Sequence, residues 1–215
     1  MNTRVYLLFA FLGCSMALGE TIRFDGATPG TMPAGWTAAM THAGGEPRWE
    51  IARDPGAPSP PFVFAQISQD RTAGRFPLAI WGGASIRNGE VSVAFKTVSG
   101  AVDQAAGIVW RYRDPNNYYI VRANALENNI VLYKVENGVR LSIAPKRMPS
   151  RSYGVKHEIP KAQWNMLRIV FQGSQFRVFF NGEQVFETED QTFGNAGKTG
   201  LWTKADSVTY LTIFR

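Results

Sequence analysis

The feature that most constrains the fold is a series of short runs in which apolar and polar residues alternate. Residues 91–98 read Val-Ser-Val-Ala-Phe-Lys-Thr-Val, and similar runs recur as far as Phe214. Successive side chains of a β-strand point to opposite faces, so a period of two residues predicts strands with one buried face. No helical period extends beyond one or two turns, which argues against long helices.

Turn residues separate these runs. Asn88-Gly89, Asn137-Gly138 and Asn181-Gly182 are Asn-Gly pairs, which favour two-residue hairpin turns because both central positions need positive φ. Gly173-Ser174 is a fourth tight turn. About ten short strands at this spacing predict an antiparallel sandwich or barrel. The predicted strands are 21–24, 91–98, 105–113, 118–125, 129–136, 139–144, 164–172, 175–181, 184–189, 199–204 and 208–214.

Residues 26–61 contain many glycines and prolines, most densely at 55–61. Such clusters disfavour regular strand pairing, so we expect this segment to be a loop. Trp36 and Trp49 lie inside it, and we expect them to pin the loop to the sandwich.

The N-terminus has the pattern of a secretory signal peptide. Arg4 is followed by an apolar run at 5–13, and Ala17 and Gly19 place small residues where a signal peptidase reads them. We therefore expect a signal peptide at 1–19, one all-β domain at 20–215, and export to the periplasm or the cell exterior. The apolar run is too short to span a bilayer of ~30 Å, and no transmembrane segment is expected.

The only cysteine, Cys14, lies inside this signal segment. Cleavage after Gly19 would leave a domain without a thiol, and hence without disulfides or a cysteine metal site. As an alternative, Leu12-Gly13-Cys14 is similar to a lipoprotein cleavage box, although Phe11 and Leu12 fit it poorly. In that case an acylated Cys14 would anchor the domain to a membrane.

The composition is that of an ordinary globular protein. With 45% hydrophobic and 19% charged residues in a chain of 215, a single all-β domain can bury a sizeable core. The formal net charge of +6 raises the question of nucleic-acid binding, but Lys and Arg are scattered along the chain without a dense run. We therefore expect no nucleic-acid partner.

Three segments carry a likeness to a known family. They are 103–111 (Asp-Gln-Ala-Ala-Gly-Ile-Val-Trp-Arg), 117–124 (Asn-Tyr-Tyr-Ile-Val-Arg-Ala-Asn), and 164–171 (Trp-Asn-Met-Leu-Arg-Ile-Val-Phe) running into 176–182. With these segments the chain resembles the concanavalin A-like lectin/glucanase superfamily. Within that superfamily it is most similar to the 3-keto-disaccharide hydrolase-like domain, over roughly residues 24–214. The resemblance implies a jelly roll of two antiparallel sheets whose concave sheet can hold a sugar.

Strand alternation then suggests which side chains line that concave sheet. Tyr118, Arg122 and Asn124 share one face of their strand, and Trp202 shares a face with Lys204. By the same parity Trp110 lies with Ile108 and Tyr112. Sugar recognition needs a flat apolar face beneath the ring and directional hydrogen bonds to the hydroxyls. The candidate substrate-binding residues are therefore Trp110, Tyr118, Arg122, Asn124, Trp202 and Lys204, against the alternative that the arginine and tryptophans only pack the fold.

Candidate catalytic groups are fewer. Hydrolysis of a glycosidic bond normally uses two carboxyl groups roughly 5 to 10 Å apart. The Glu-x-Asp-x-x-Glu motif of laminarinase-type members of the superfamily is absent. Asp103, before the strand of Trp110, and Glu127, in the turn 124–129, are the best-placed acids, although each also fits a turn or cap role. The acidic cluster at 187–190 ends a strand, where carboxylates are most often only solvated.

No cofactor or metal is expected from the residues themselves. His42 and His157 are single and far apart, so no histidine pair has the spacing of metal ligands. The resemblance adds one exception, because jelly rolls of this type often hold a structural Ca²⁺. Asp25 would supply one oxygen to such an ion, and one carboxylate does not make a site.

Three functions follow from these observations. The first is an exported enzyme that hydrolyses a 3-keto-sugar glycoside or a related glycoside. The second is a non-catalytic carbohydrate-binding domain, favoured by the aromatic, arginine and asparagine side chains without an evident acid pair. The third is a structural envelope domain with no sugar ligand, in which a loop such as 55–61 fills the concave sheet.

Overall fold

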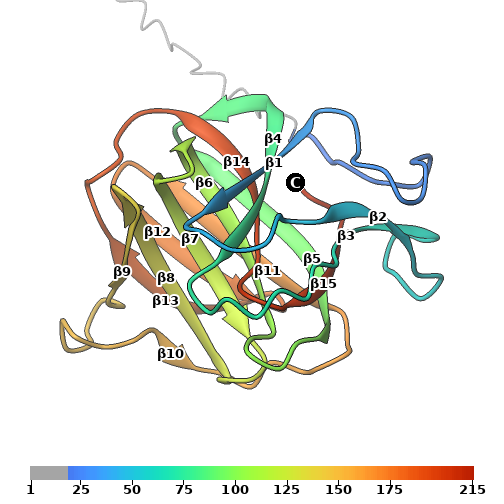
Figure 1. Cartoon of the computed structure of the whole chain (residues 1–215). Helices are drawn as coiled ribbons and strands as arrows, with labels where there is room; N and C mark the ends of the chain where they lie inside the picture. Colours follow the sequence, from blue (N-terminus) through green and yellow to red (C-terminus); the bar gives the residue numbers. More distant parts are fainter. Residues whose placement is uncertain (1–18) are drawn as a thin grey trace, which may run out of the picture.

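The computed structural model describes residues 19–215; residues 1–18, with Cys14 and nearly all of the expected signal peptide, lie outside the described part. Residues 19–215 form fifteen strands and no helix. The strands make two antiparallel sheets that pack face to face as a jelly-roll sandwich (Figure 1). The predicted all-β class and two-sheet architecture are therefore confirmed.

The eight-stranded sheet has β1 (Trp36–Thr41), β4 (Phe76–Ile86), β14 (Gly197–Trp202), β6 (Ala105–Asp114), β7 (Asn117–Asn124), β8 (Asn129–Glu136) and β10 (Val155–Lys156) in that order, with β9 (Val139–Ile143) also paired to β8. The seven-stranded sheet runs β13 (Glu183–Glu189), β12 (Gln175–Phe180), β11 (Asn165–Gln172), β5 (Gly89–Ser99), β15 (Val208–Thr212), β3 (Phe62–Gln66) and β2 (Trp49–Arg53). Strands distant in sequence, such as β4 and β14, are neighbours in a sheet, so each sheet is built from both halves of the chain.

The main core lies between the two sheets. Alternate residues of β5 and β11 point into it, as the period of two residues predicts; Val93 and Leu167 are examples, both fully buried. Trp110 of β6 stacks on Tyr119 of β7, with ring centroids 5.3 Å apart, and meets Phe176 of β12 edge-on at 5.4 Å. These aromatic contacts join the two sheets.

A bulge in β6 changes the expected orientation of its side chains. Arg111 has a φ of 49°, and the pairing of β6 with β7 shifts register between Trp110 and Asp114. Because the extra residue reverses the alternation, Trp110 lies between the sheets while Tyr112 packs on the opposite face. The expected grouping of Trp110 with Tyr112 is therefore wrong.

The same bulge places the Arg111 side chain in the inter-sheet core, where it is 1% exposed and lies over the rings of Phe171 and Phe176. Its guanidinium donates hydrogen bonds to the backbone carbonyls of Arg87 (2.9 and 3.1 Å), Phe193 (2.7 Å) and Gly173 (2.6 Å). Arg111 therefore ties three separate turns to one end of the sandwich.

The segment 26–61 is more regular than expected. It contains β1 and β2, and β3 and β4 follow it before residue 91, although none of the four was predicted. β4 carries Pro77 and the pair Gly82-Gly83, which conceal its strand pattern, yet it pairs with β1 on one side and β14 on the other. Trp36 and Trp49 are buried, but as strand residues rather than as anchors of a loop.

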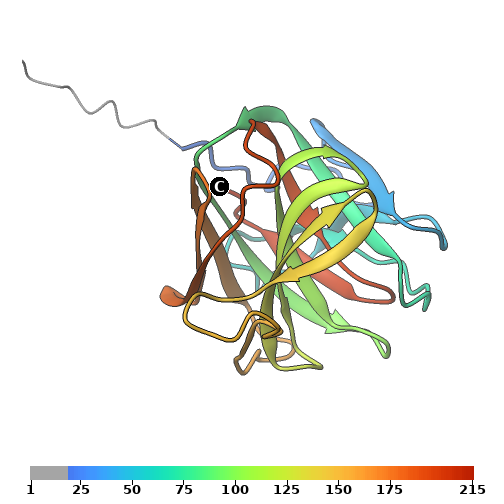
Figure 2. The same ribbon diagram turned by 90° about the vertical axis from the view of Figure 1, so that its left-hand side faces the viewer.

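A second buried cluster covers the other, concave face of the eight-stranded sheet. β6, β7 and β8 curve strongly, which is visible in the green-to-yellow strands of Figure 2. Arg140 of β9 lies over the rings of Phe76 of β4 and Tyr133 of β8, at 4.7 and 4.5 Å. Arg140 thus joins β4, near one edge of the sheet, to β8, near the other edge, across this face. We call the buried residues there the concave cluster: Phe76, Leu78, Ile80, Ala105, Val109, Tyr118, Ile120, Val131, Tyr133, Val135 and Trp202.

The concave face is therefore filled by side chains of its own strands and by Arg140. Residues 55–61 connect β2 to β3 at the edge of the seven-stranded sheet. The expectation that this proline-rich loop fills the concave sheet is wrong.

The role of Arg111 is testable by truncation. We expect Arg111→Ala to lower the free energy of unfolding by about 3 kcal/mol, because it leaves buried carbonyls without a charged donor. Arg177→Ala is the matched control, since Arg177 is exposed on β12, and should cost less than ~0.5 kcal/mol. Urea unfolding followed by tryptophan fluorescence measures both; equal, small losses would contradict the assigned role.

Candidate functional site

Three of the expected aromatic binding residues cannot present a ring to a ligand. Trp110 is buried between the sheets, so its expected position on the concave face is wrong. Tyr118 and Trp202 do lie on the concave face, but both are fully buried in the concave cluster. Trp202 packs against Phe76 with centroids 5.4 Å apart, and the Tyr118 hydroxyl lies 2.7 Å from Oγ1 of Thr41.

The polar part of the concave face lies at the end of β7 and is centred on Arg122. Arg122, whose side chain is 2% exposed, donates to Oε2 of Glu127 (2.7 Å) and to the hydroxyls of Tyr133 (3.1 Å) and Tyr153 (3.2 Å). It also donates to Oδ1 of Asn129, whose Nδ2 in turn donates to Glu127 at 3.0 Å. We call these five residues the Arg122 cluster.

The cluster has a buried base and an exposed rim. Arg122, Asn129 and Tyr133 are buried, whereas Tyr153 is 48% exposed and the Glu127 side chain 37% exposed. The Tyr153 ring stands edge-on to Tyr133, with centroids 5.8 Å apart, and the hydroxyls of the two tyrosines are hydrogen-bonded. The Tyr153 ring and the Glu127 carboxylate are therefore accessible to solvent, and both are hydrogen-bonded to the buried Arg122.

An ion pair between Asp103 and Lys204 adjoins the Arg122 cluster, and Asn124 is hydrogen-bonded to the Asp103 carboxylate. Oδ1 of Asp103 accepts a hydrogen bond from Nδ2 of Asn124, and Oδ2 accepts one from Nζ of Lys204, both at 2.6 Å. The Asp103 side chain is 1% exposed and that of Lys204 18%. Asp206 fixes the preceding turn, because its carboxylate accepts the backbone N–H groups of Ala101, Val102 and Asp103.

The surroundings move the pKa values of the two candidate acids in opposite directions. Burial raises the pKa of Asp103, and the nearby charge of Glu127 adds to this, although Lys204 and Arg122 oppose it. Burial also acts to raise the pKa of Glu127. There, however, the Arg122 charge, the hydrogen bonds from Asn129 and Arg122 and the Lys204 charge outweigh it, and the pKa falls below its ordinary value. Glu127 is thus held as a carboxylate.

The structure brings together Arg122, Asn124, Lys204, Asp103 and Glu127 from the predicted set and separates Trp110, Tyr118 and Trp202 from them. The sequence interpretation missed Asn129, Tyr133 and Tyr153. The first two follow from the hairpin register, because Asn124 pairs with Asn129 and Ile120 with Tyr133, which places these residues on one face. Tyr153 lies outside the strands in a polar stretch, so no periodicity marks it.

Asp25, the one carboxylate suggested for a structural Ca²⁺, is hydrogen-bonded within the protein. Asp25 accepts a hydrogen bond from Oγ of Ser59 at 2.8 Å, and Ser59 also accepts one from Arg23. Within residues 19–215, no group of three or more His, Cys, Asp or Glu side chains lies close enough to hold a metal ion.

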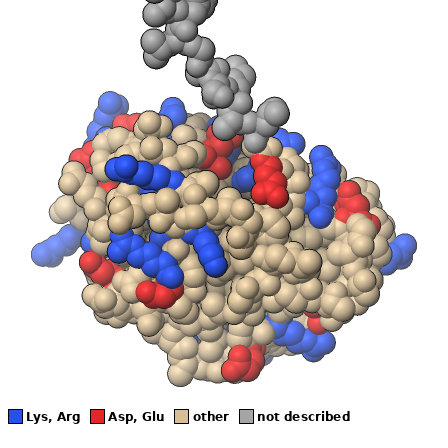
Figure 3. Space-filling model, turned by 90° about the horizontal axis from the view of Figure 1, so that it is seen from above, with Lys and Arg blue, Asp and Glu red and all other residues tan. Residues whose placement is uncertain are grey.

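Surface charges of both signs are interspersed on the face seen from above in Figure 3, which carries no continuous basic area. In the part of the chain that the structure describes, no helix is long and apolar enough to cross a membrane.

Opposite pH dependences test the two carboxyl environments. Because the Asp103 pKa is raised, wild type should lose stability relative to Asp103→Asn as pH rises from below the ordinary value of 3.8 through the raised pKa. Because the Glu127 pKa is lowered, wild type should lose stability relative to Glu127→Gln as pH falls from the ordinary value of 4.5 through the lowered pKa. Urea unfolding from pH 3 to pH 7 measures both differences, and slopes of the same sign would refute this assignment.

Comparison with known proteins assigns the chain to a family. Residues 21–213 match the family profile described as the 3-keto-alpha-glucoside-1,2-lyase-like domain. A search of curated proteins finds no matching sequence.

Among the solved structures that share the fold are a carbohydrate-binding module and a GH43 protein. The carbohydrate-binding module CBM66 from Bacillus subtilis superposes with a TM-score of 0.63 at 18% identity, covering 84% of this chain and 93% of that one. A mutant of the GH43 protein BlXynB from Bacillus licheniformis superposes with a TM-score of 0.51 at 16% identity, covering 78% of this chain and 36% of that one. Identities this low show the fold alone. The profile match spans nearly the whole described chain, and the protein therefore belongs to the 3-keto-alpha-glucoside-1,2-lyase-like domain family.

Proposed function

We propose that this domain binds carbohydrate at the Arg122 cluster without cleaving it. The observation that carries the proposal is the pairing of an exposed aromatic ring, Tyr153, with an exposed carboxylate, Glu127, on one buried guanidinium. The flat face of a tyrosine ring suits the apolar face of a sugar, and a carboxylate accepts hydrogen bonds from sugar hydroxyls. The carbohydrate-binding module with the same fold supports this assignment by analogy.

The hydrogen bonds of Glu127 leave one of its oxygens for a ligand. Arg122 and Asn129 both donate to Oε2. Among the described residues, no side chain or backbone N–H donates to Oε1. A sugar hydroxyl that donates to Oε1 would gain a charge-assisted hydrogen bond without displacing a protein contact.

The buried base keeps this rim in place before a ligand arrives. Arg122 is fixed by four side-chain acceptors, and through it both Glu127 and the Tyr153 hydroxyl are restrained. Side chains that are already ordered lose less conformational entropy on binding, so a small contact area can still give measurable affinity.

Hydrolysis fits the site poorly. A glycosidase needs two carboxyl groups that flank the bond, but Asp103 is almost completely buried and both of its oxygens are bonded, to Asn124 and Lys204. Only Glu127 of the two candidate acids reaches solvent. The expected acid pair is therefore not available to a ligand in this arrangement.

A second candidate function, elimination, needs only one base, and the family match favours it. In a 3-keto-glucoside the ketone acidifies the C2 proton. The Glu127 carboxylate would take that proton, the electron pair would form the C1–C2 double bond, the C1–O bond would break, and the leaving oxygen would take a proton from water. A base works best when its pKa lies near the working pH. The lowered pKa of Glu127 makes it a weak base, which is why binding is the preferred function.

The proposed place of action is the periplasm or the cell exterior. The signal-peptide pattern of residues 1–19 supports it, with acylation at Cys14 as the alternative form of export.

Glycan binding tests the proposal. With isothermal titration calorimetry against a panel of neutral oligosaccharides, Tyr153→Ala should weaken binding at least tenfold and Glu127→Gln by a smaller factor. Tyr210→Ala, which removes a half-buried tyrosine from the seven-stranded sheet, is the control and should bind as wild type does. Affinity that survives Tyr153→Ala unchanged would rule out this site.

Chemistry is tested separately. Wild type incubated with a 3-keto-α-glucoside should leave the substrate intact, as followed by mass spectrometry and by ultraviolet absorbance of an unsaturated keto sugar. Turnover by wild type that disappears in Glu127→Gln would replace binding with elimination as the function.

A further inference from the structure

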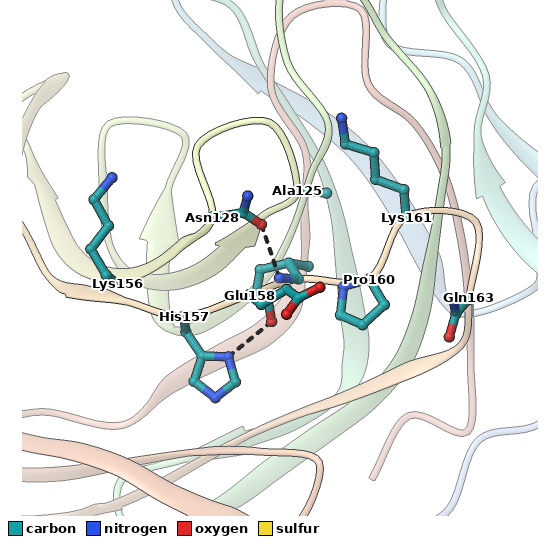
Figure 4. Close-up of a pocket in the computed structure, with 9 residues that line it drawn as sticks. Ala125, Asn128, Lys156, His157, Glu158, Pro160, Lys161 and Gln163 are labelled. Atoms are coloured by element: carbon teal, nitrogen blue, oxygen red, sulfur yellow. Dashed lines mark hydrogen bonds between the residues drawn. The ribbon is translucent and has the colours of Figure 1, made fainter.

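An open pocket adjoins the turn between β7 and β8 that carries Glu127 of the Arg122 cluster. It has a volume of about 800 Å³ and is formed mainly by the segment 156–163 together with Ala125 and Asn128 (Figure 4). Glu127 and Asn128 are consecutive in the turn between β7 and β8, yet Glu127 joins the Arg122 cluster and Asn128 lines the pocket. Lys156, also in the pocket lining, donates to the backbone oxygen of Glu127 at 3.3 Å.

Nitrogen donors gather on one side of this pocket. Figure 4 shows the amide nitrogen of Asn128 and the ammonium ends of Lys156 and Lys161 on the same side of the 156–163 segment. The amide is oriented by the backbone, because Oδ1 of Asn128 accepts the N–H of Ile159 at 3.1 Å. That contact leaves the NH₂ group of Asn128 directed away from Ile159.

The two lysines have no carboxylate partner among the described residues. Both are exposed, and neither forms an ion pair within residues 19–215. The imidazole of His157 and the carboxylate of Glu158, the one acid in the lining, lie on the opposite side of the segment from the lysine ends. The donor side of the pocket therefore carries two ammonium groups without an ion-pair partner among residues 19–215.

The chain leading into the pocket has the same sign. Residues 137–157 contain Arg140, Lys146, Arg147, Arg151 and Lys156 and no Asp or Glu. The segment also carries Tyr153, the exposed ring of the Arg122 cluster. Lys146 is paired with Glu189, and Arg140 packs on the concave face. Arg147, Arg151 and Lys156 are therefore the remaining cations of this segment, and none of them forms an ion pair within residues 19–215.

From these observations we infer that the pocket is a second subsite, which takes an anionic substituent of the carbohydrate, a carboxylate or a sulfate ester, on a sugar next to the one at Tyr153. Lys156 and Lys161 attract the anion, and the Asn128 amide donates a directional hydrogen bond to it. This inference rests on the proposed function, because the Arg122 cluster supplies the neighbouring sugar site. The preferred ligand is accordingly an acidic glycan.

The test compares three probes by calorimetry: an oligogalacturonate, the same oligomer with its carboxyl groups reduced to alcohols, and a sulfated neutral oligosaccharide. The double substitution Lys156→Gln with Lys161→Gln should weaken oligogalacturonate binding at least fivefold and leave the reduced oligomer unaffected. Lys198→Gln, an exposed cation on β14, is the control and should change neither. A fivefold loss confined to the sulfated probe identifies sulfate as the anion.

Other outcomes separate this inference from the proposed function. If Tyr153→Ala abolishes binding of all probes while the double lysine variant binds both oligogalacturonate and the sulfated probe normally, the sugar site holds and the anionic subsite is refuted. If the lysine variant alone weakens binding, the pocket holds and the Arg122 cluster is not the sugar site. Equal affinity of wild type for oligogalacturonate, its reduced form and the sulfated oligosaccharide overturns the inference, as does lysine-dependent binding to anionic phospholipid vesicles that exceeds binding to any glycan.

Discussion

The eight-stranded sheet is buried on both of its faces, and this constraint governs what the domain can do. One face packs against the second sheet, and the other curls until Arg140 bridges Phe76 and Tyr133. Aromatic side chains that would serve a more open sandwich as platforms for sugar, notably Tyr118 and Trp202, are thereby consumed in packing. Ligand contact is left to the end of the sheet, where polar side chains replace apolar ones along β7.

Two ion pairs fix the positions of the side chains at that end of the sheet. Arg122 and Lys204 each hold a carboxylate, but they do so at different depths: Glu127 at the surface and Asp103 almost entirely inside. The difference in depth explains why one acid is stabilised in its ionised form while the other is pushed toward its protonated form. Glu127 and Asp103, which the sequence suggested as a catalytic pair, therefore differ in the structure. Glu127 is a hydrogen-bond acceptor at the surface, and Asp103 is a buried structural group.

Much of the fold could be predicted from residue alternation and turn chemistry. The strands from residue 91 onward follow that pattern, except for the unpredicted two-residue β10, and the even-numbered residues of β7 do share a face. The strands β1 to β4 were missed, because proline and glycine in and around them conceal a pairing that distant strands enforce. Trp110 was misplaced because it shares the inter-sheet face of Ile108, opposite Tyr119 of β7. Its separation from Tyr112 comes from a single residue in the left-handed region, Arg111, which reverses the alternation, and nothing local announces such a bulge. Of the site, Arg122, Asn124 and the two acids were predicted, whereas Tyr153 depends on tertiary contacts alone.

In the turn between β7 and β8, the consecutive residues Glu127 and Asn128 belong to different surroundings: Glu127 to the Arg122 cluster and Asn128 to the neighbouring pocket. Its conformation is set from within, since Oδ1 of Asn124 accepts the N–H groups of Leu126 and Glu127 and Asn128 adopts a φ of 48°. Inserting or deleting a residue there would move Glu127 and Asn128 to the wrong sides at once. Relatives that diversify their ligands should therefore do so by exchanging side chains at constant turn length.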